Sequence, residues 1–237
     1  MFTFEELKAV VAALRGEDGC PWDKSQTHES LKPYVIEEAY EVNQAVSDLT
    51  RTNDSANLIE ELGDLLFQVM LQAQVAEDYG EFTIDDVIDG ITRKMIHRHP
   101  HVFGGKSYES TDQQQADWER LKSEENGHVS EDGSVREEFD KVPAAFPALI
   151  RGQKIAKKAG RRNLISMEEE EIFRDILTHL IALEAAALKE ADEGDLHKEL
   201  GRLLFAICRF TALHRLSGEH ALTETINHFI DEMKGEE

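Results

Sequence analysis

Apolar residues recur at intervals of three and four along most of the chain, which is the spacing typical of amphipathic α-helices. The clearest stripe, between residues 31 and 49, consists of Val35, Ile36, Ala39, Val42, Val46 and Leu49. Segments 58–73 and 84–96 have the same period, and Thr83 precedes the latter as a typical N-cap. No segment shows the alternation of a half-buried β-strand, so the pattern predicts an all-α protein.

The longest break in the helical pattern lies just past the middle of the chain. Residues 126–142 are rich in charge and contain Gly127 and Gly133, which is typical of a linker. We therefore expect a first unit over residues 1–125, a linker over 126–142 and a second unit over 143–237.

An internal repeat relates the two expected units. The segment ELGDLLF at Glu61–Phe67 returns as ELGRLLF at Glu199–Phe205, with one residue changed. Long helices with short connections favour antiparallel bundles. The repeat therefore predicts two related helical-bundle units in tandem.

The charge of the chain is strongly and unevenly acidic. Asp and Glu number 48 against 26 Lys and Arg, so the net charge is −22, which disfavours binding of DNA or RNA. Residues 1–142 carry −18 of this charge, from 13 basic and 31 acidic residues. Solubility explains such a surface, and so does a cluster of carboxylates that holds cations.

Other features of the composition bear on location. No apolar run approaches the roughly 20 residues that a membrane helix needs, so no membrane partner is expected. The beginning of the chain lacks the pattern of a signal peptide. The two cysteines, Cys20 and Cys208, form no motif. These features predict a reduced, cytoplasmic protein.

Two short acidic segments are the main candidates for chemistry. Glu38 and Glu41 are three residues apart on the first predicted helix, and Glu61 and Asp64 have the same spacing on the next. Both pairs lie at the same edge of the apolar stripe, so packing of the two stripes brings the four carboxylates together. Glu37 points farther round its helix, which makes it a candidate for orienting or deprotonating a water.

Four close carboxylates repel one another unless a cation lies between them. Ligands that are all oxygen suit Mg²⁺ or Mn²⁺, whereas zinc sites usually include Cys or His. A di-iron bundle needs Glu-x-x-His on its helices, and the one example here, Glu125 to His128, spans Gly127 in the expected linker. The alternative is that these pairs are ordinary solvated helix faces.

Basic and aromatic residues elsewhere could bind a substrate. Lys94 and Arg98 are four residues apart at the end of a predicted helix and share a face, which suits binding of phosphate groups. Favourable interaction with the helix dipole is the simpler explanation for these charges. Trp22 and Trp118 are the two tryptophans, and each could stack on a base or pack in a core.

These residues occur in segments that closely resemble the MazG family of nucleoside triphosphate pyrophosphohydrolases. The segments are GCPWDKSQTHESLKPYVIEEAYEV, EELGDLLFQV, RKMIHRHPHVFGG and ADWERLKSEE, in this order. The resemblance implies an all-α enzyme that forms dimeric bundles, so that homodimerisation completes the bundle. It also implies Mg²⁺-dependent cleavage of NTPs and dNTPs to the monophosphate and pyrophosphate, as a housecleaning of the nucleotide pool.

The resemblance also implies roles for individual residues. Metal ligands in the family fall at the positions of Glu38, Glu41, Glu61 and Asp64. A Lys and an Arg that contact the phosphates correspond to Lys94 and Arg98, and a Trp near the nucleotide corresponds to Trp118.

The second unit departs from this pattern. Thr178, His179 and Ala182 stand where the first unit has Glu37, Glu38 and Glu41, and Arg202 replaces Asp64. An arginine repels Mg²⁺, so we expect the second unit to be non-catalytic. Two readings compete with the main one, namely a related activity such as a dUTPase or phosphoribosyl-ATP pyrophosphatase, and an acidic interaction module without catalysis.

Overall fold

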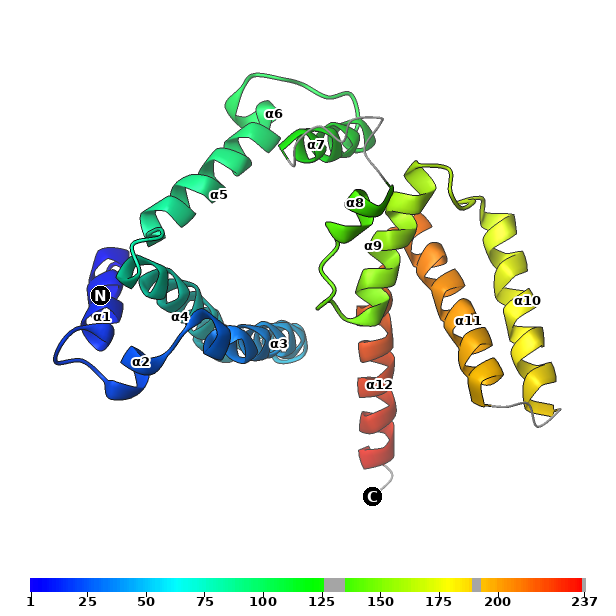
Figure 1. Ribbon diagram of the computed structural model, residues 1–237, viewed down its shortest axis with the longest axis horizontal. Coiled ribbons are helices and arrows are strands. Elements are labelled where there is room, and N and C mark those ends of the chain that lie inside the picture. Colours follow the sequence, from blue (N-terminus) through cyan, green and yellow to red (C-terminus); the bar gives the residue numbers. More distant parts are fainter. Residues whose placement is uncertain (126–134, 189–192, 236–237) are drawn as a thin grey trace. The chain divides into compact units, whose positions relative to one another are not determined.

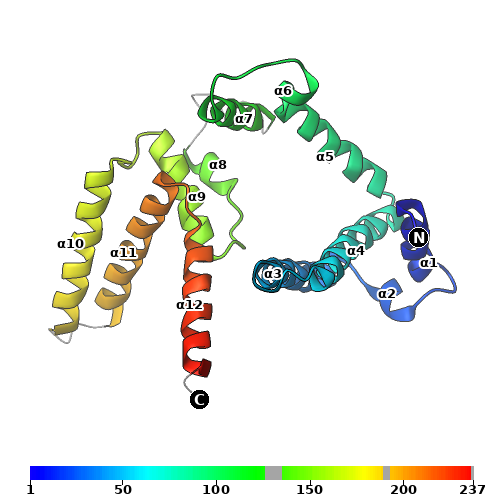
Figure 2. The ribbon, with the colours of Figure 1, turned by 180° about the vertical axis from the view of Figure 1, so that it is seen from behind.

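A computed structural model describes residues 1–125, 135–188 and 193–235. The described residues form helices and no β-strand, which confirms the all-α prediction (Figure 1). The chain divides into two compact units at residues 125 and 126, and Figure 2 shows the helices of each from behind. The helices of the first unit are α1 (Phe4–Arg15), α2 (Pro21–Ser25), α3 (His28–Thr52), α4 (Ala56–Asp78), α5 (Ile84–Arg98), α6 (Pro100–Phe103) and α7 (Thr111–Glu125).

Polar side chains fix where the main helices of the first unit begin. Thr83 accepts a hydrogen bond from the Asp86 backbone N–H, and the Asp86 carboxylate accepts one from the Thr83 backbone N–H. This capping box confirms the predicted start of α5. A similar box between Thr27 and Ser30 begins α3, and Asn53 in the left-handed region, with φ of 55°, ends it.

The core of the first unit lies at one end of the α3–α4 hairpin. Leu31 from α3 and Leu71 and Val75 from α4 are almost fully buried there, with Val11 from α1 and Ile84 from α5. Farther along the hairpin, α1 and α5 no longer cover the two helices. Large apolar side chains are exposed there: Ile36, Tyr40, Ile59, Leu62 and Leu66.

The second unit also contains a pair of long helices with further helices packed on it. Its helices are α8 (Val135–Asp140), α9 (Ala148–Arg161), α10 (Glu169–Leu188), α11 (Glu193–Leu213) and α12 (Gly218–Gly235). Helices α10 and α11 pack side by side as α3 and α4 do, and α9 packs on α11. The two copies of the sequence repeat therefore occupy equivalent helices, α4 and α11.

The expected linker is partly helical. Residues 135–140 form α8, which packs on α9 with the help of an ion pair between Glu138 and Arg162. Residues 126–134 of the linker lie outside the described residues. Segment 135–140 is charged because it forms a short helix that packs on α9 with one face only. The helix was not predicted, since six residues are too few to show a helical period.

Within the described residues, no helix combines the length and the apolar character that crossing a membrane requires.

Candidate functional site

Three carboxylates converge where α3 packs on α4. Glu38 projects from α3, and Glu61 and Asp64 project from α4 one turn apart. One carboxylate oxygen from each of the three lies within 4.8 Å of the others. Helices α3 and α4 bring the residues together because both carry their acidic pair at the edge of the apolar stripe along which they pack.

The fourth carboxylate, Glu41, lies next to this cluster. It interacts with the Glu38 side chain and adds its charge to the field at Glu61. Partial burial raises the pKa of Glu38, and the charges of Asp64 and Glu41 raise it further. The pKa of Glu61 is also raised, first by partial burial and then by Glu41, Glu60 and Asp64. When all of these carboxylates are ionised, their negative charges repel one another.

Nothing in the described protein offsets this negative charge with a positive side chain. No lysine or arginine of the described residues forms an ion pair with Glu38, Glu61 or Asp64. A divalent cation relieves the repulsion, and the all-oxygen donor set fits Mg²⁺ or Mn²⁺. The residues present thus fit the predicted ion.

At the equivalent place in the second unit, Glu199 is engaged by a contact with His179 and by an ion pair with Arg202. The His179 Nδ1 atom lies 3.0 Å from Glu199 Oε2, and Arg202 Nη1 donates to Glu199 Oε1 at 2.7 Å. His179 and Arg202 hold the pKa of Glu199 below its usual value. The contact between His179 and Glu199 matches the approach of Glu38 to Glu61, which supports the predicted alignment. Among the four equivalent positions of the second unit, all of them described, Glu199 is the one carboxylate, and these two contacts already engage it.

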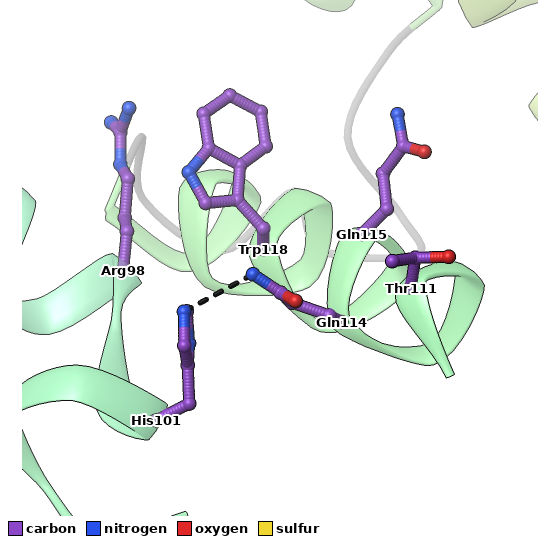
Figure 3. Close-up of a pocket in the computed structure, with 6 residues that line it drawn as sticks. All are labelled: Arg98, His101, Thr111, Gln114, Gln115 and Trp118. Carbon is purple, nitrogen blue, oxygen red and sulfur yellow. Dashed lines mark hydrogen bonds between the residues drawn. The ribbon is translucent and has the colours of Figure 1, made fainter. Parts of the chain in front are cut away.

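A second feature of the first unit is a cavity of about 370 Å³ among α5, α6 and α7 (Figure 3). Its lining consists of Arg98, His101, Thr111, Gln114, Gln115 and Trp118. The Arg98 guanidinium carbon lies 5.5 Å from the centre of the Trp118 ring, and Lys122 Nζ lies 4.9 Å from it. Gln114 Nε2 donates to His101 Nε2 at 3.1 Å. The cavity thus offers an aromatic face beside positive charge.

Arg98 is held in this cavity by an acidic partner. Its Nε donates to both carboxylate oxygens of Glu125, at 3.1 and 3.2 Å, and its Nη2 also contacts Glu125. The Arg98 hydrogen bonds lower the pKa of Glu125. A carboxylate accepting two N–H bonds from one arginine has the geometry with which arginine also binds phosphate. Arg98 is therefore oriented for an anion.

Asp117 anchors α7 to the preceding loop. It accepts hydrogen bonds from Lys106 Nζ at 2.8 Å and from the Tyr108 hydroxyl at 2.5 Å, and Arg120 donates to it within α7. These three partners hold the pKa of Asp117 well below its usual range. The anchor matters because Trp118 is the next residue.

The predicted site residues thus fall into two groups, and within one copy of the first unit the two groups do not meet. Glu38, Glu61 and Asp64 form the carboxylate cluster, and Arg98 and Trp118 line the cavity. Within the described first unit, α7 packs on α5 and makes no helix contact with α3 or α4.

The remaining candidates lie outside both groups. Glu37 and Lys94 are exposed. Trp22 is half-exposed, and its ring meets the edge of Tyr34 at 6.1 Å between centroids. Sequence reasoning did not assign His101 and Gln114 to this cavity. His101 lies on α6, which is too short to give a periodic signal, and Gln114 lies on α7 and meets His101 only through the fold.

Comparisons with known proteins identify relatives of this chain. A family model described as the MazG nucleotide pyrophosphohydrolase domain matches residues 26–103, which include the whole carboxylate cluster. The chain is 38% identical over 235 residues to a protein of Thermotoga maritima named nucleoside triphosphate pyrophosphohydrolase/pyrophosphatase MazG, which covers 98% of this chain and 84% of the relative. It is 35% identical to the nucleoside triphosphate pyrophosphohydrolase of Escherichia coli K12, over 87% of this chain and 76% of that protein. A Bacillus subtilis relative, the uncharacterized protein YabN, is 38% identical over 95% of this chain, but the match spans only 44% of YabN.

Proposed function

This chain belongs to the MazG family of nucleotide pyrophosphohydrolases, and we propose that it hydrolyses nucleoside triphosphates to nucleoside monophosphate and pyrophosphate with the help of Mg²⁺. The observation that carries the proposal is the carboxylate cluster of Glu38, Glu61 and Asp64, with oxygens within 4.8 Å of one another. NTPs and dNTPs are both substrates in this proposal. The role is housecleaning of the cytoplasmic nucleotide pool.

Glu38, Glu61 and Asp64, with Glu41 beside them, would hold the cation, and Mn²⁺ would substitute for Mg²⁺. The bound ion supplies charge neutralisation, which allows a triphosphate to approach a strongly acidic surface. Burial is the main cause of the raised pKa of Glu38 and of Glu61, and the neighbouring carboxylates raise both further; this second, repulsive contribution is the one that a cation would remove.

Other side chains bind the nucleotide and the attacking water. Glu37 orients the water and accepts its proton as the oxygen attacks phosphorus near the α–β bridge, and pyrophosphate leaves. Lys94 and Arg98 stabilise the charge that moves onto the phosphate oxygens, and a phosphate replaces Glu125 on Arg98. Trp118 stacks on the base in the cavity beside Arg98. Trp22 is a second stacking surface, supported by its exposure.

A homodimer completes the bundle. The distal part of the α3–α4 hairpin exposes Ile36 and Tyr40 at 57% each and Ile59 at 69%, which is costly for a single copy in water. A second copy packed on this surface turns the two-helix hairpin into a four-helix bundle. It also allows the cavity of one copy to face the carboxylates of the other, which the single copy does not achieve.

Mixing of two inactive variants tests this shared arrangement. Asp64→Asn removes a carboxylate, and Arg98→Ala removes a phosphate-binding group. Random exchange of subunits makes half of the dimers mixed. If the two halves of the site come from different copies, each mixed dimer has one intact site of two. The mixture then regains up to about one quarter of the wild-type rate per chain. Absence of recovery after exchange, verified by subunit labelling, places both groups in one copy.

The second unit does not take part in catalysis in this proposal, because Arg202 and His179 occupy the only remaining carboxylate, Glu199. Its contribution is packing, dimerisation or regulation.

The activity is tested by pyrophosphate release from NTPs and dNTPs. Asp64→Asn should abolish Mg²⁺-dependent turnover without lowering the unfolding temperature. Glu77→Gln, which removes an exposed carboxylate from the same helix away from the cluster, should leave turnover unchanged. Full activity of Asp64→Asn, or no activity of the wild-type protein on any nucleotide, would refute the proposal.

A further inference from the structure

The side-chain amide of Gln68 is buried beside the carboxylate cluster. Its contacts within the protein do not explain why an amide is needed there. Gln68 on α4 is only 8% exposed, and it is one of the few polar residues buried in the first unit. It lies four residues after Asp64 and seven after Glu61, so the three side chains share one face of α4.

The two ends of this amide have different surroundings. The nitrogen, Nε2, lies 3.5 Å from Glu38 Oε1 and donates to it. The oxygen, Oε1, is buried and has no hydrogen-bond partner within the described residues. The opposite orientation of the amide would put two acceptors against each other, so Nε2 belongs on the side of Glu38.

A buried polar atom without a partner is rare in folded proteins, and it usually marks a bound water, an ion or a functional group. The packing of α4 does not need an amide, since an apolar side chain of similar size fills the same volume. The second unit has no amide at the equivalent position of its repeat: Ala206, a smaller apolar residue, stands there and is buried at 2% exposure. The amide is therefore present where the carboxylates are complete and absent where they are lost.

We propose that Gln68 is a positioning residue of the cation site, an inference that rests on the proposed function. Its Nε2 holds the Glu38 carboxylate toward Glu61 and Asp64, so that the three oxygens are already arranged before a cation binds. Its Oε1 accepts a hydrogen bond from a water that enters with the hydrated ion, since Mg²⁺ keeps several of its waters when carboxylates bind it.

Gln68→Met tests this role, because methionine has nearly the same length and volume but no hydrogen-bonding amide. Gln68→Leu is a second variant of different shape. Gln74→Met is the matched control, since Gln74 lies on the same helix and donates to Asp78 at 3.1 Å, away from the cluster. Binding of Mn²⁺ to the nucleotide-free protein is measured by electron paramagnetic resonance, and stability by calorimetry.

Both Gln68 variants should bind Mn²⁺ about 10- to 100-fold more weakly, which is the usual effect of losing a partner of a metal ligand. Their unfolding temperature without metal should be equal to or above that of the wild-type protein, because an unpaired buried oxygen is gone. The Mg²⁺ concentration needed for half-maximal turnover should rise by the same factor, with an unchanged KM for the nucleotide at saturating Mg²⁺. Gln74→Met should change none of these.

A double-mutant cycle with Glu38→Gln shows whether Gln68 acts through Glu38. In the Glu38→Gln background, Gln68→Met should weaken Mn²⁺ binding by a clearly smaller factor than in the wild-type background, because the part that acts through Glu38 is already lost. Unchanged Mn²⁺ binding in both Gln68 variants, or a full additive loss in the double variant, would overturn the inference and leave the proposed function standing. Absence of Mn²⁺ binding to the wild-type protein would overturn both.

Discussion

Replacing Glu38 by glutamine removes one charge from the carboxylate cluster and preserves the shape of the side chain. The pKa of Glu38 in the folded protein is raised from 4.5, so the folded state binds its proton more tightly than the unfolded chain does. Its contribution to stability is therefore full below about pH 4.5 and is lost as the pH rises through the folded-state pKa. At pH 7 without metal, Glu38→Gln should unfold at the same temperature as the wild-type protein or a higher one.

Addition of Mg²⁺ should reverse this order. At a free concentration of 100 times the dissociation constant, binding stabilises the first unit by about 2.7 kcal/mol. If Glu38→Gln weakens binding about 100-fold, the same concentration stabilises the variant by only about 0.4 kcal/mol. For a unit of 125 residues these values correspond to shifts of about 10 °C and about 2 °C in the unfolding temperature.

Differential scanning calorimetry over a Mg²⁺ titration measures both effects. Glu77→Gln serves as the control for the loss of one negative charge on the hairpin, and it should show the full wild-type shift. Equal Mg²⁺ shifts in Glu38→Gln and the wild-type protein would refute the assignment of Glu38 as a ligand. A lower unfolding temperature of the metal-free variant would show that the carboxylate is held by contacts other than a cation.

Three further substitutions test the cavity, the anchor of α7 and the packing of the second unit. Trp118→Ala should raise the KM for nucleotides about 5- to 150-fold, from about 1–3 kcal/mol of lost stacking, with a smaller change in kcat. Asp117→Asn should accelerate amide hydrogen exchange in α7 at pH 7. The difference from the wild type should shrink as the pH falls below about 4, because the lowered pKa of Asp117 then contributes progressively less stability to the folded state. Gly152→Ala should destabilise the second unit by about 1–3 kcal/mol, measured by calorimetry, because its Cβ would lie 2.7 Å from Cys208 Sγ.

Sequence periodicity was sufficient to predict the main helices and the convergence of the acidic pairs. Helices α3 and α4 are long, so that their apolar stripes fix the face along which they pack, and the carboxylates at the edge of the stripes follow. The start of α5 was predictable as well, because Thr83 and Asp86 act locally.

The cavity and the buried amide depend on contacts that no periodicity reveals. His101 and Gln114 are 13 residues apart and meet only because the loop after α6 folds α7 back onto α5. Gln68 lies at the acidic edge of the apolar stripe, on the face of Glu61 and Asp64, and a polar residue at that edge looks ordinary in the sequence. Its burial and its unpartnered oxygen are seen only in the structure. The helical part of the expected linker, α8, was missed because six residues are too few to show a period.

In the proposed reaction, a water oxygen attacks the α- or the β-phosphorus of a nucleoside triphosphate, and the P–O bond of that phosphorus to the α–β bridging oxygen breaks. The most direct measurement is ³¹P NMR of the products formed from NTPs and dNTPs by the wild-type protein with Mg²⁺ in ¹⁸O-enriched water. We expect nucleoside monophosphate and pyrophosphate, with an isotope shift on one of these two products and loss of the reaction in Asp64→Asn. Nucleoside diphosphate and orthophosphate as the products, or no turnover of any nucleotide, would contradict the proposed reaction.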